Sequence, residues 1–222
     1  MALSTGADSP DKITHCFVLA GGDLAWSMLE GEKVFPNDDP FQEPIGINSK
    51  YIENRHIRLA PGWYGVILGK GTKGVTQKRH RECEETLPNM TLPPMGHQAI
   101  VRRKGCVVGI VKIAHSVPYE YCQDSPWVVE GYPVCNIISH AGWIDKPIEC
   151  KGNLGACPIK EEDVRECVRA YANAAYKDGN IFPTGAELKY PWRGAGVWNK
   201  GRKRKASPAC IALKDESFVS HK

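Results

Sequence analysis

The sequence lacks long apolar stretches, and no run approaches the roughly 20 consecutive apolar residues that a membrane-spanning helix requires. We therefore expect no membrane insertion. The first twelve residues, MALSTGADSPDK, also lack the basic and apolar segments of a secretory signal. These absences favour an intracellular protein, located in the cytoplasm, the nucleus or both.

Cysteines are present, but not in the patterns that bind metal or form a disulfide framework. The chain has nine of them, and the closest two, Cys150 and Cys157, are separated by six residues, whereas structural zinc sites pair cysteines two to four residues apart. The histidines show no H-x-x-x-H spacing. His15 and Cys16 are adjacent, and neighbours in a strand point to opposite faces. We expect no disulfide, metal, cofactor or catalytic cysteine.

A strong excess of one charge is also missing, except in one segment. Lys and Arg number 29 and Asp and Glu 25, which gives a net charge of +4. This balance is compatible with a nucleic-acid partner without requiring one. Part of the excess lies in the run KGRKRK at residues 200–205. Such a run is typical of a nuclear-import signal or a non-specific nucleic-acid tether, and equally of a solvated tail.

Short apolar runs separated by glycine and proline favour strands over a helical bundle. The strands that this pattern predicts lie at residues 15–20, 63–68, 99–102, 106–114, 134–139 and 147–150. Helical spacing predicts a short helix over 23–30 and a longer one over 161–177, while 34–60 reads mainly as loop. We expect an α+β fold, a β-barrel with an early inserted helix and a C-terminal helix.

The same pattern predicts one compact domain over residues 13–160. Residues 1–12 are small and polar, and we expect them to be disordered. Residues 161–198 carry the C-terminal helix and an extension, and residues 199–222 form a basic disordered tail. We expect the protein to be a monomer.

A glycine-rich segment, GKGTKG at residues 69–74, follows a predicted strand and matches the G-x-G-x-x-G pattern of dinucleotide-binding proteins. The next residues, VTQKRHREC, have no apolar face that would pack on a parallel sheet, and no acidic residue lies about 20 positions further on. We interpret the segment as a solvated turn whose lysines, Lys70 among them, can face a phosphate.

Four blocks of sequence occur in the order typical of the ASCH family. Residues 24–33 resemble the family's short amphipathic helix ending in G-x-K, and residues 59–70 its next strand with a small-residue–Lys turn. Residues 105–111 (GCVVGIV) resemble its G-x-[IV]-V-G strand. Residues 136–152 are similar to the closing hairpin of the ASCH proteins associated with endothelium and lymphocytes. The resemblance spans residues 15–159 and implies a PUA-like β-barrel whose cleft, between the G-x-K helix and the sheet, binds RNA or a modified nucleobase.

The resemblance also implies roles for basic and aromatic residues. Lys33 would place a fixed positive charge at the centre of the cleft, although a lysine after a helix can also simply offset the helix dipole. Trp26 or Trp63 would supply a stacking face, unless both belong to the core. The residues expected to contact phosphates are Arg55, Arg58, Lys70 and Lys151.

The sequence departs from the family pattern directly after Lys33. Many members continue with an E-x-R, whereas VFPN follows here at residues 34–37. We hypothesise that Arg55 or Arg58 replaces the missing arginine from beyond this insertion.

Three functions remain open at this point. The leading one is a non-catalytic reader of RNA or of a modified nucleotide. Some small bacterial ASCH proteins resemble amidohydrolases that act on acylated cytidine through a Lys and a Thr three residues later. Here that position is Pro36, so catalysis, in which Lys33 would take part, is the weaker hypothesis. The third is a coregulator-type module that binds protein partners through the helix at 161–177.

Overall fold

The computed structural model describes residues 9–19, 22–30, 32–34, 45–47, 50–69, 103–152 and 155–192. The predictions for the strand at 99–102, Lys70 and the tail at 199–222 lie outside these ranges. Within them, no helix combines the length and the apolar character needed to cross a membrane.

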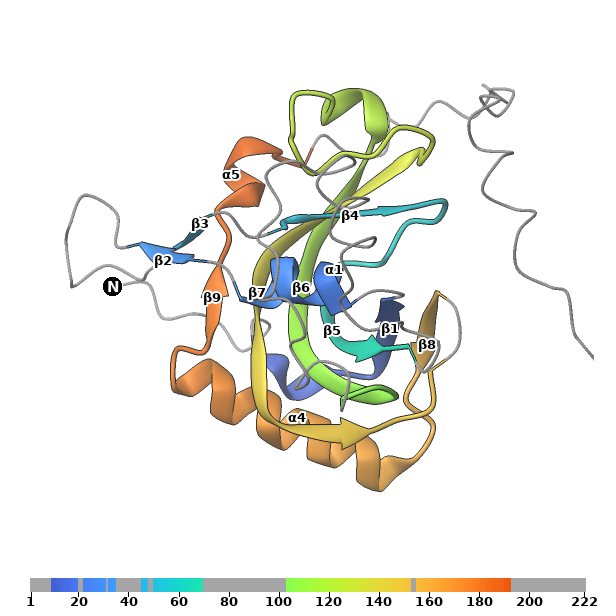
Figure 1. The fold of residues 1–222 in the computed structure, drawn as a ribbon, viewed down its shortest axis with the longest axis vertical. Helices are drawn as coiled ribbons and strands as arrows, with labels where there is room; N and C mark the ends of the chain where they lie inside the picture. The colour runs from blue at the N-terminus through green and yellow to red at the C-terminus, as the bar shows by residue number, and fades with distance from the viewer. Residues whose placement is uncertain are drawn as a thin grey trace, which may run out of the picture.

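A curled mixed sheet of seven strands forms the centre of the molecule (Figure 1). Its strands are β1 (His15–Leu19), β4 (Ile52–Arg55), β5 (Gly62–Leu68), β6 (Cys106–Pro118), β7 (Val134–Glu149), β8 (Ala156–Pro158) and β9 (Ile181–Pro183). Their order is β4-β7-β6-β5-β1-β8, and β9 also pairs with β7. β1 runs parallel to β5, and the other pairs are antiparallel. A separate two-stranded sheet joins β2 (Glu32–Val34) to β3 (Ile45–Ile47).

The long strands β6 and β7 curve because their pairing is repeatedly offset. Their register shifts between Val107 and Gly109, between Lys112 and Ile113, and again before His115. Each such bulge bends the strands and increases their twist. The sheet is therefore curled, as Figure 1 shows.

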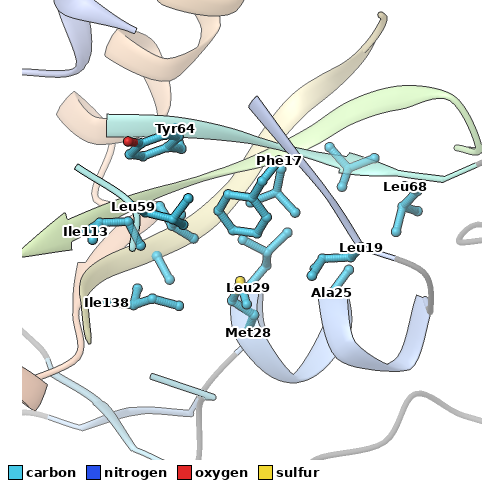
Figure 2. Close-up of a cluster of buried hydrophobic side chains, with 14 of the residues drawn as sticks. Phe17, Leu19, Ala25, Met28, Leu29, Leu59, Tyr64, Leu68, Ile113 and Ile138 are labelled. Atoms are coloured by element: carbon cyan, nitrogen blue, oxygen red, sulfur yellow. The ribbon is translucent and has the colours of Figure 1, made fainter. Parts of the chain in front are cut away.

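The inner face of the curl is covered by helix α1 (Gly22–Leu29). Met28 and Leu29 of this helix are buried in one apolar cluster with Phe17 of β1 (Figure 2). Gly109 of β6 allows the close approach. A Cβ at this position would lie 2.7 Å from Leu29 Cδ2 and 2.7 Å from the carbonyl oxygen of Gly142.

The outer face is covered by helix α4 (Glu162–Lys177). Its buried residues Val168, Ala172 and Ala175 follow helical spacing and pack in a second apolar cluster with Trp63 of β5. The predicted helix at 161–177 is therefore confirmed, and its apolar face is used within the domain.

Residues 9–12 correct the prediction of a disordered segment over 1–12. They form a short 3-10 helix, Pro10–Lys12, capped by Ser9, whose hydroxyl accepts a hydrogen bond from the Asp11 N–H at 3.3 Å. The side chain of Asn173 on α4 hydrogen-bonds to Asp11 and to Ser9. These partners lie more than 160 residues away along the chain, so local composition does not reveal them.

Two further corrections concern the strands. The predicted strands at 134–139 and 147–150 are parts of one strand, β7. Proline has no N–H to donate, and the strand tolerates Pro147 because residues 144–147 of β7 lie between the paired residues Trp143 and Ile148 and do not pair with β6. Residues 34–60, predicted to be mainly loop, contain β3 and β4 as well as the end of β2.

The remaining elements lie at the upper end of the view in Figure 1. They are a short helix α5 (Ala186–Lys189) and a 3-10 turn at Tyr119–Tyr121. A third apolar cluster, which includes Ile52 of β4, Trp127 and Tyr190, packs this end. The α+β class and the curled sheet agree with the sequence-based expectation.

Candidate functional site

Three charged side chains on and beside β4 form what we call the cation cluster: Lys50, Glu53 and Arg55. Side chains alternate along a strand, so Glu53 and Arg55 share one face. Ile52 points to the other face, where it joins the apolar cluster around Trp127. The strand thus presents an apolar side to the core and a charged side toward β1 and α1.

The cluster is compact and largely buried. The side chains of Lys50 and Glu53 are 3% and 8% exposed, and that of Arg55 is 19% exposed. Lys50 Nζ lies 2.8 Å from Glu53 Oε2, and Arg55 Nε lies 2.8 Å from Glu53 Oε1. Lys50 Nζ also donates to the carbonyl oxygen of Ile52. One carboxylate therefore serves two cations, and the cluster carries a net charge of +1.

Backbone contacts fix the cluster between α1 and β1. The N–H of Lys50 donates to the carbonyl oxygen of Ser27 on α1 at 2.7 Å. An Nη of Arg55 donates to the carbonyl oxygen of Val18 at 3.1 Å, and its guanidinium lies 5.4 Å from the centre of the Phe17 ring. The Nε of Arg55 is buried, and its ion-pair contact with Glu53 Oε1 does not have the geometry of a hydrogen bond.

A pair of tryptophans, one of them on α1, packs against the apolar cluster that contains Met28 and Leu29. The rings of Trp26 and Trp143 meet edge to face, with centres 6.0 Å apart, and both are half-buried against the inner cluster. Trp143 Nε1 donates to Glu30 Oε2 at 2.6 Å, and the Arg103 guanidinium lies 5.4 Å from the centre of the Trp143 ring. These contacts position both rings.

A pocket of about 560 Å³ opens where the β4–β5 connection meets β6. The residues that line it are Arg58, Leu59, Ala60, Pro61, Ala114, His115, Ser116 and Trp192. His115 is buried, its Nε2 hydrogen-bonds to the carbonyl oxygen of Tyr190, and its ring lies 6.0 Å from that of Trp192. Burial lowers the pKa of His115, against smaller opposing effects of the Tyr190 carbonyl and Glu187. The imidazole is therefore neutral at pH 7.

Asn136 of β7 organises the connection between the cluster and the pocket. Its side chain is completely buried. Oδ1 accepts from the N–H of Leu59 at 2.8 Å and from the hydroxyl of Ser116 at 2.7 Å. Nδ2 donates to the carbonyl oxygens of Glu53 and Ile57 at 3.1 and 3.4 Å. All four hydrogen-bonding positions of the amide are thus used, which fixes the path of residues 53–59.

The predicted site residues do not all come together. Arg55 belongs to the cation cluster, Arg58 lines the pocket, and Lys151 is exposed beyond the end of β7. Lys33 lies in β2, in the two-stranded sheet, and its side chain is outside the described part of the chain, as is Lys70.

Trp63 lies in the core, which is one of the two positions that the sequence left open for it. It is 7% exposed and belongs to the outer cluster, on the other face of the sheet from Trp26. The ring of Tyr176 on α4 meets it edge to face at 5.7 Å, and Lys112 Nζ lies 5.7 Å from its centre. Residues 63 and 64 alternate across β5, so Tyr64 faces the inner cluster and Trp63 the outer one.

Sequence reasoning missed Lys50, Glu53, His115 and Trp192. For the first two a signal existed, since Glu53-Asn54-Arg55 is an E-x-R that follows Lys50 by three residues. It does not lie directly after Lys33, where the resemblance implies such a pattern. No sequence motif marks His115 or Trp192.

The described cysteines form no disulfide, and Cys16 is hydrogen-bonded to Cys150. Seven are described, all are free thiols, and the buried ones are Cys16, Cys122, Cys135, Cys150 and Cys157. A hydrogen bond with Cys150, together with burial, raises the pKa of Cys16, so this thiol is a poor nucleophile at neutral pH. In the described ranges, no three His, Cys, Asp or Glu side chains are grouped so that they could hold a metal ion.

Comparison with protein-family models and with curated proteins found no match for this chain.

Proposed function

We propose that the protein is an ASCH-type, PUA-like binder of RNA or of a modified nucleotide, with the cation cluster at the centre of its binding site. The proposal moves the central lysine from Lys33 to Lys50. Lys50, Glu53 and Arg55 have the Lys and E-x-R arrangement that the resemblance leads us to expect, and they lie beside α1, the helix of the resembling segment.

The observation that carries the proposal is that one buried carboxylate serves two cations. Taking charged groups out of water costs several kcal/mol per ion, and apolar residues of similar size often stabilise a fold as well or better. A net positive charge at low dielectric is stabilised further by an anion. The guanidinium of Arg55, which is 19% exposed, supplies donors for such a ligand.

Two structural features favour binding over the other hypotheses. The residue three positions after Lys50 is Glu53, which pairs with the lysine and is not a hydroxyl nucleophile. The apolar residues of α4 are buried against the sheet, so that helix offers a protein partner mainly its polar side.

The test is a titration of a short, fluorescently labelled single-stranded RNA, followed by anisotropy between about 50 and 200 mM salt. The wild type should bind more weakly as salt rises, because phosphate contacts release counterions. Arg55→Gln should weaken binding about tenfold or more, the value of a charge-assisted hydrogen bond.

The matched control is Arg165→Gln on α4, which removes the same charge from an arginine paired with Glu162 on the outer face. Circular dichroism should show that both variants fold. Equal affinities of Arg55→Gln and Arg165→Gln, with no response to salt, would contradict the proposal. Turnover of an acylated cytidine by the wild type would replace it with the amidohydrolase hypothesis.

A further inference from the structure

We infer that the pocket beside Trp192 is a separate site for one nucleobase with its phosphate, either a free nucleoside monophosphate or one nucleotide of an RNA strand. The inference deepens the proposed function, on which it rests for the class of ligand. Its own support comes from the size of the pocket and from three side chains that line it: Trp192, His115 and Arg58.

The pocket has the dimensions and the lining of a small-molecule site. Its volume of about 560 Å³ falls within the roughly 300–1,000 Å³ usual for such sites. Leu59, Ala60, Pro61 and Ala114 make much of the wall apolar, and few polar groups converge on it. This composition suits a flat, mostly apolar ring with a few polar atoms at its edge.

Trp192 offers a stacking surface. It is 58% exposed, in contrast to Trp63 and Trp127, which are 7% and 2% exposed. Its contact with the ring of His115 keeps it at the pocket. A large aromatic ring that lines a pocket but remains mostly accessible can stack on a base without first being released from the core.

His115 adds a hydrogen-bond acceptor. The carbonyl oxygen of Tyr190 can only accept, so Nε2 carries the proton that joins them. Because the ring is neutral, Nδ1 is left as an acceptor, and no described residue hydrogen-bonds to it. Every nucleobase carries N–H groups that can donate to such a nitrogen.

Arg58 supplies a positive charge for the phosphate, the group that distinguishes a nucleotide from a nucleoside. It is exposed and lines the pocket. Asn136 holds the backbone on either side of it, through Ile57 and Leu59. A guanidinium on a fixed loop matches the geometry of a phosphate.

The experiment is calorimetric titration of the full chain with AMP and CMP, repeated with adenosine and cytidine. The nucleotides should bind the wild type more tightly than the nucleosides, and Arg58→Gln should abolish this difference. Trp192→Leu should weaken both classes about 5- to 150-fold, the range expected for loss of one stacking contact. Leu188→Ala is the matched control, since Leu188 is 86% exposed and does not line the pocket.

The outcomes separate the inference from the proposed function. If AMP and CMP fail to bind, or bind Trp192→Leu and Arg58→Gln as well as the wild type, the inference is overturned, whatever RNA does. If the nucleotides bind through Trp192 and Arg58 while RNA binding ignores Arg55→Gln, the inference stands and the proposed cluster site fails.

RNA binding by Trp192→Leu then identifies the source of the ligand. A loss similar to that seen with AMP means that the pocket takes one nucleotide of the strand. Unchanged RNA affinity, with loss of AMP binding, means that the pocket takes a free mononucleotide. Both results support a base site in the pocket.

Discussion

Glu53 provides the strongest test of the electrostatics of the cation cluster. Glu53→Gln keeps nearly the same shape but removes the negative charge that Lys50 and Arg55 share. Leaving a buried charge without its partner costs about 3–5 kcal/mol. Arg55 keeps its bond to the carbonyl oxygen of Val18 and is partly exposed, so we expect the lower end, about 3 kcal/mol of unfolding free energy.

Urea denaturation at pH 7, followed by circular dichroism, measures this loss. Glu162→Gln is the control, because Glu162 is 58% exposed and its ion pair with Arg165 should be worth less than about 1 kcal/mol. Lys50→Met should cost less than Glu53→Gln, since it leaves Glu53 paired with Arg55. A Glu53→Gln variant as stable as Glu162→Gln, or more stable than Lys50→Met, would refute the reasoning.

Two further predictions concern packing and pH. Gly142→Ala should lower the unfolding free energy by about 3 kcal/mol, because its Cβ would lie 2.8 Å from Ile181 Cα and even closer to the carbonyl oxygen of Asn180. Urea titration checks it, and a loss below about 0.5 kcal/mol, the size of an ordinary surface change, would contradict it. The pKa of His115 is lower in the folded state than the unperturbed value of 6.5. As pH falls, this histidine is therefore protonated in the unfolded chain before it is protonated in the folded protein. The stability from the neutral ring is present above pH 6.5 and is lost as pH falls through the folded pKa. His115→Gln should flatten the fall in stability between neutral and acidic pH, and an unchanged slope would contradict this.

The sequence predicts those helices and strands whose apolar residues recur at regular local intervals. The helix at 161–177 was predictable because Val168, Ala172 and Ala175 recur at helical intervals. β4 was missed because a four-residue strand with one apolar side chain has no periodic signal. It forms because β7 pairs with it, with Ile52 opposite Ile137 about 85 residues further along the chain. Long-range pairing of this kind overrides local propensity.

The candidate site could be predicted in part. The sequence predicts Arg55 and Arg58 as phosphate contacts; in the structure, Arg55 belongs to the cation cluster and Arg58 lines the pocket. The sequence does not predict on which face of the sheet Trp63 lies. Its strand has apolar residues on both sides, so the pattern does not indicate which apolar cluster each residue joins. Trp192 reaches the pocket only because the chain returns through β9 and α5.

Asn136 explains why the cation cluster and the pocket, whose arginines are only three residues apart in the sequence, lie at different places in the fold. Arg55 points to β1, whereas Arg58, three residues later, lines the pocket beside β6. The amide of Asn136 binds the backbone at Glu53 and at Leu59, on either side of both arginines. The connection is therefore set before any ligand arrives, and a ligand that contacts both arginines need not lose binding free energy to order the loop. A buried amide with all its hydrogen bonds satisfied also specifies this arrangement more strictly than apolar packing would.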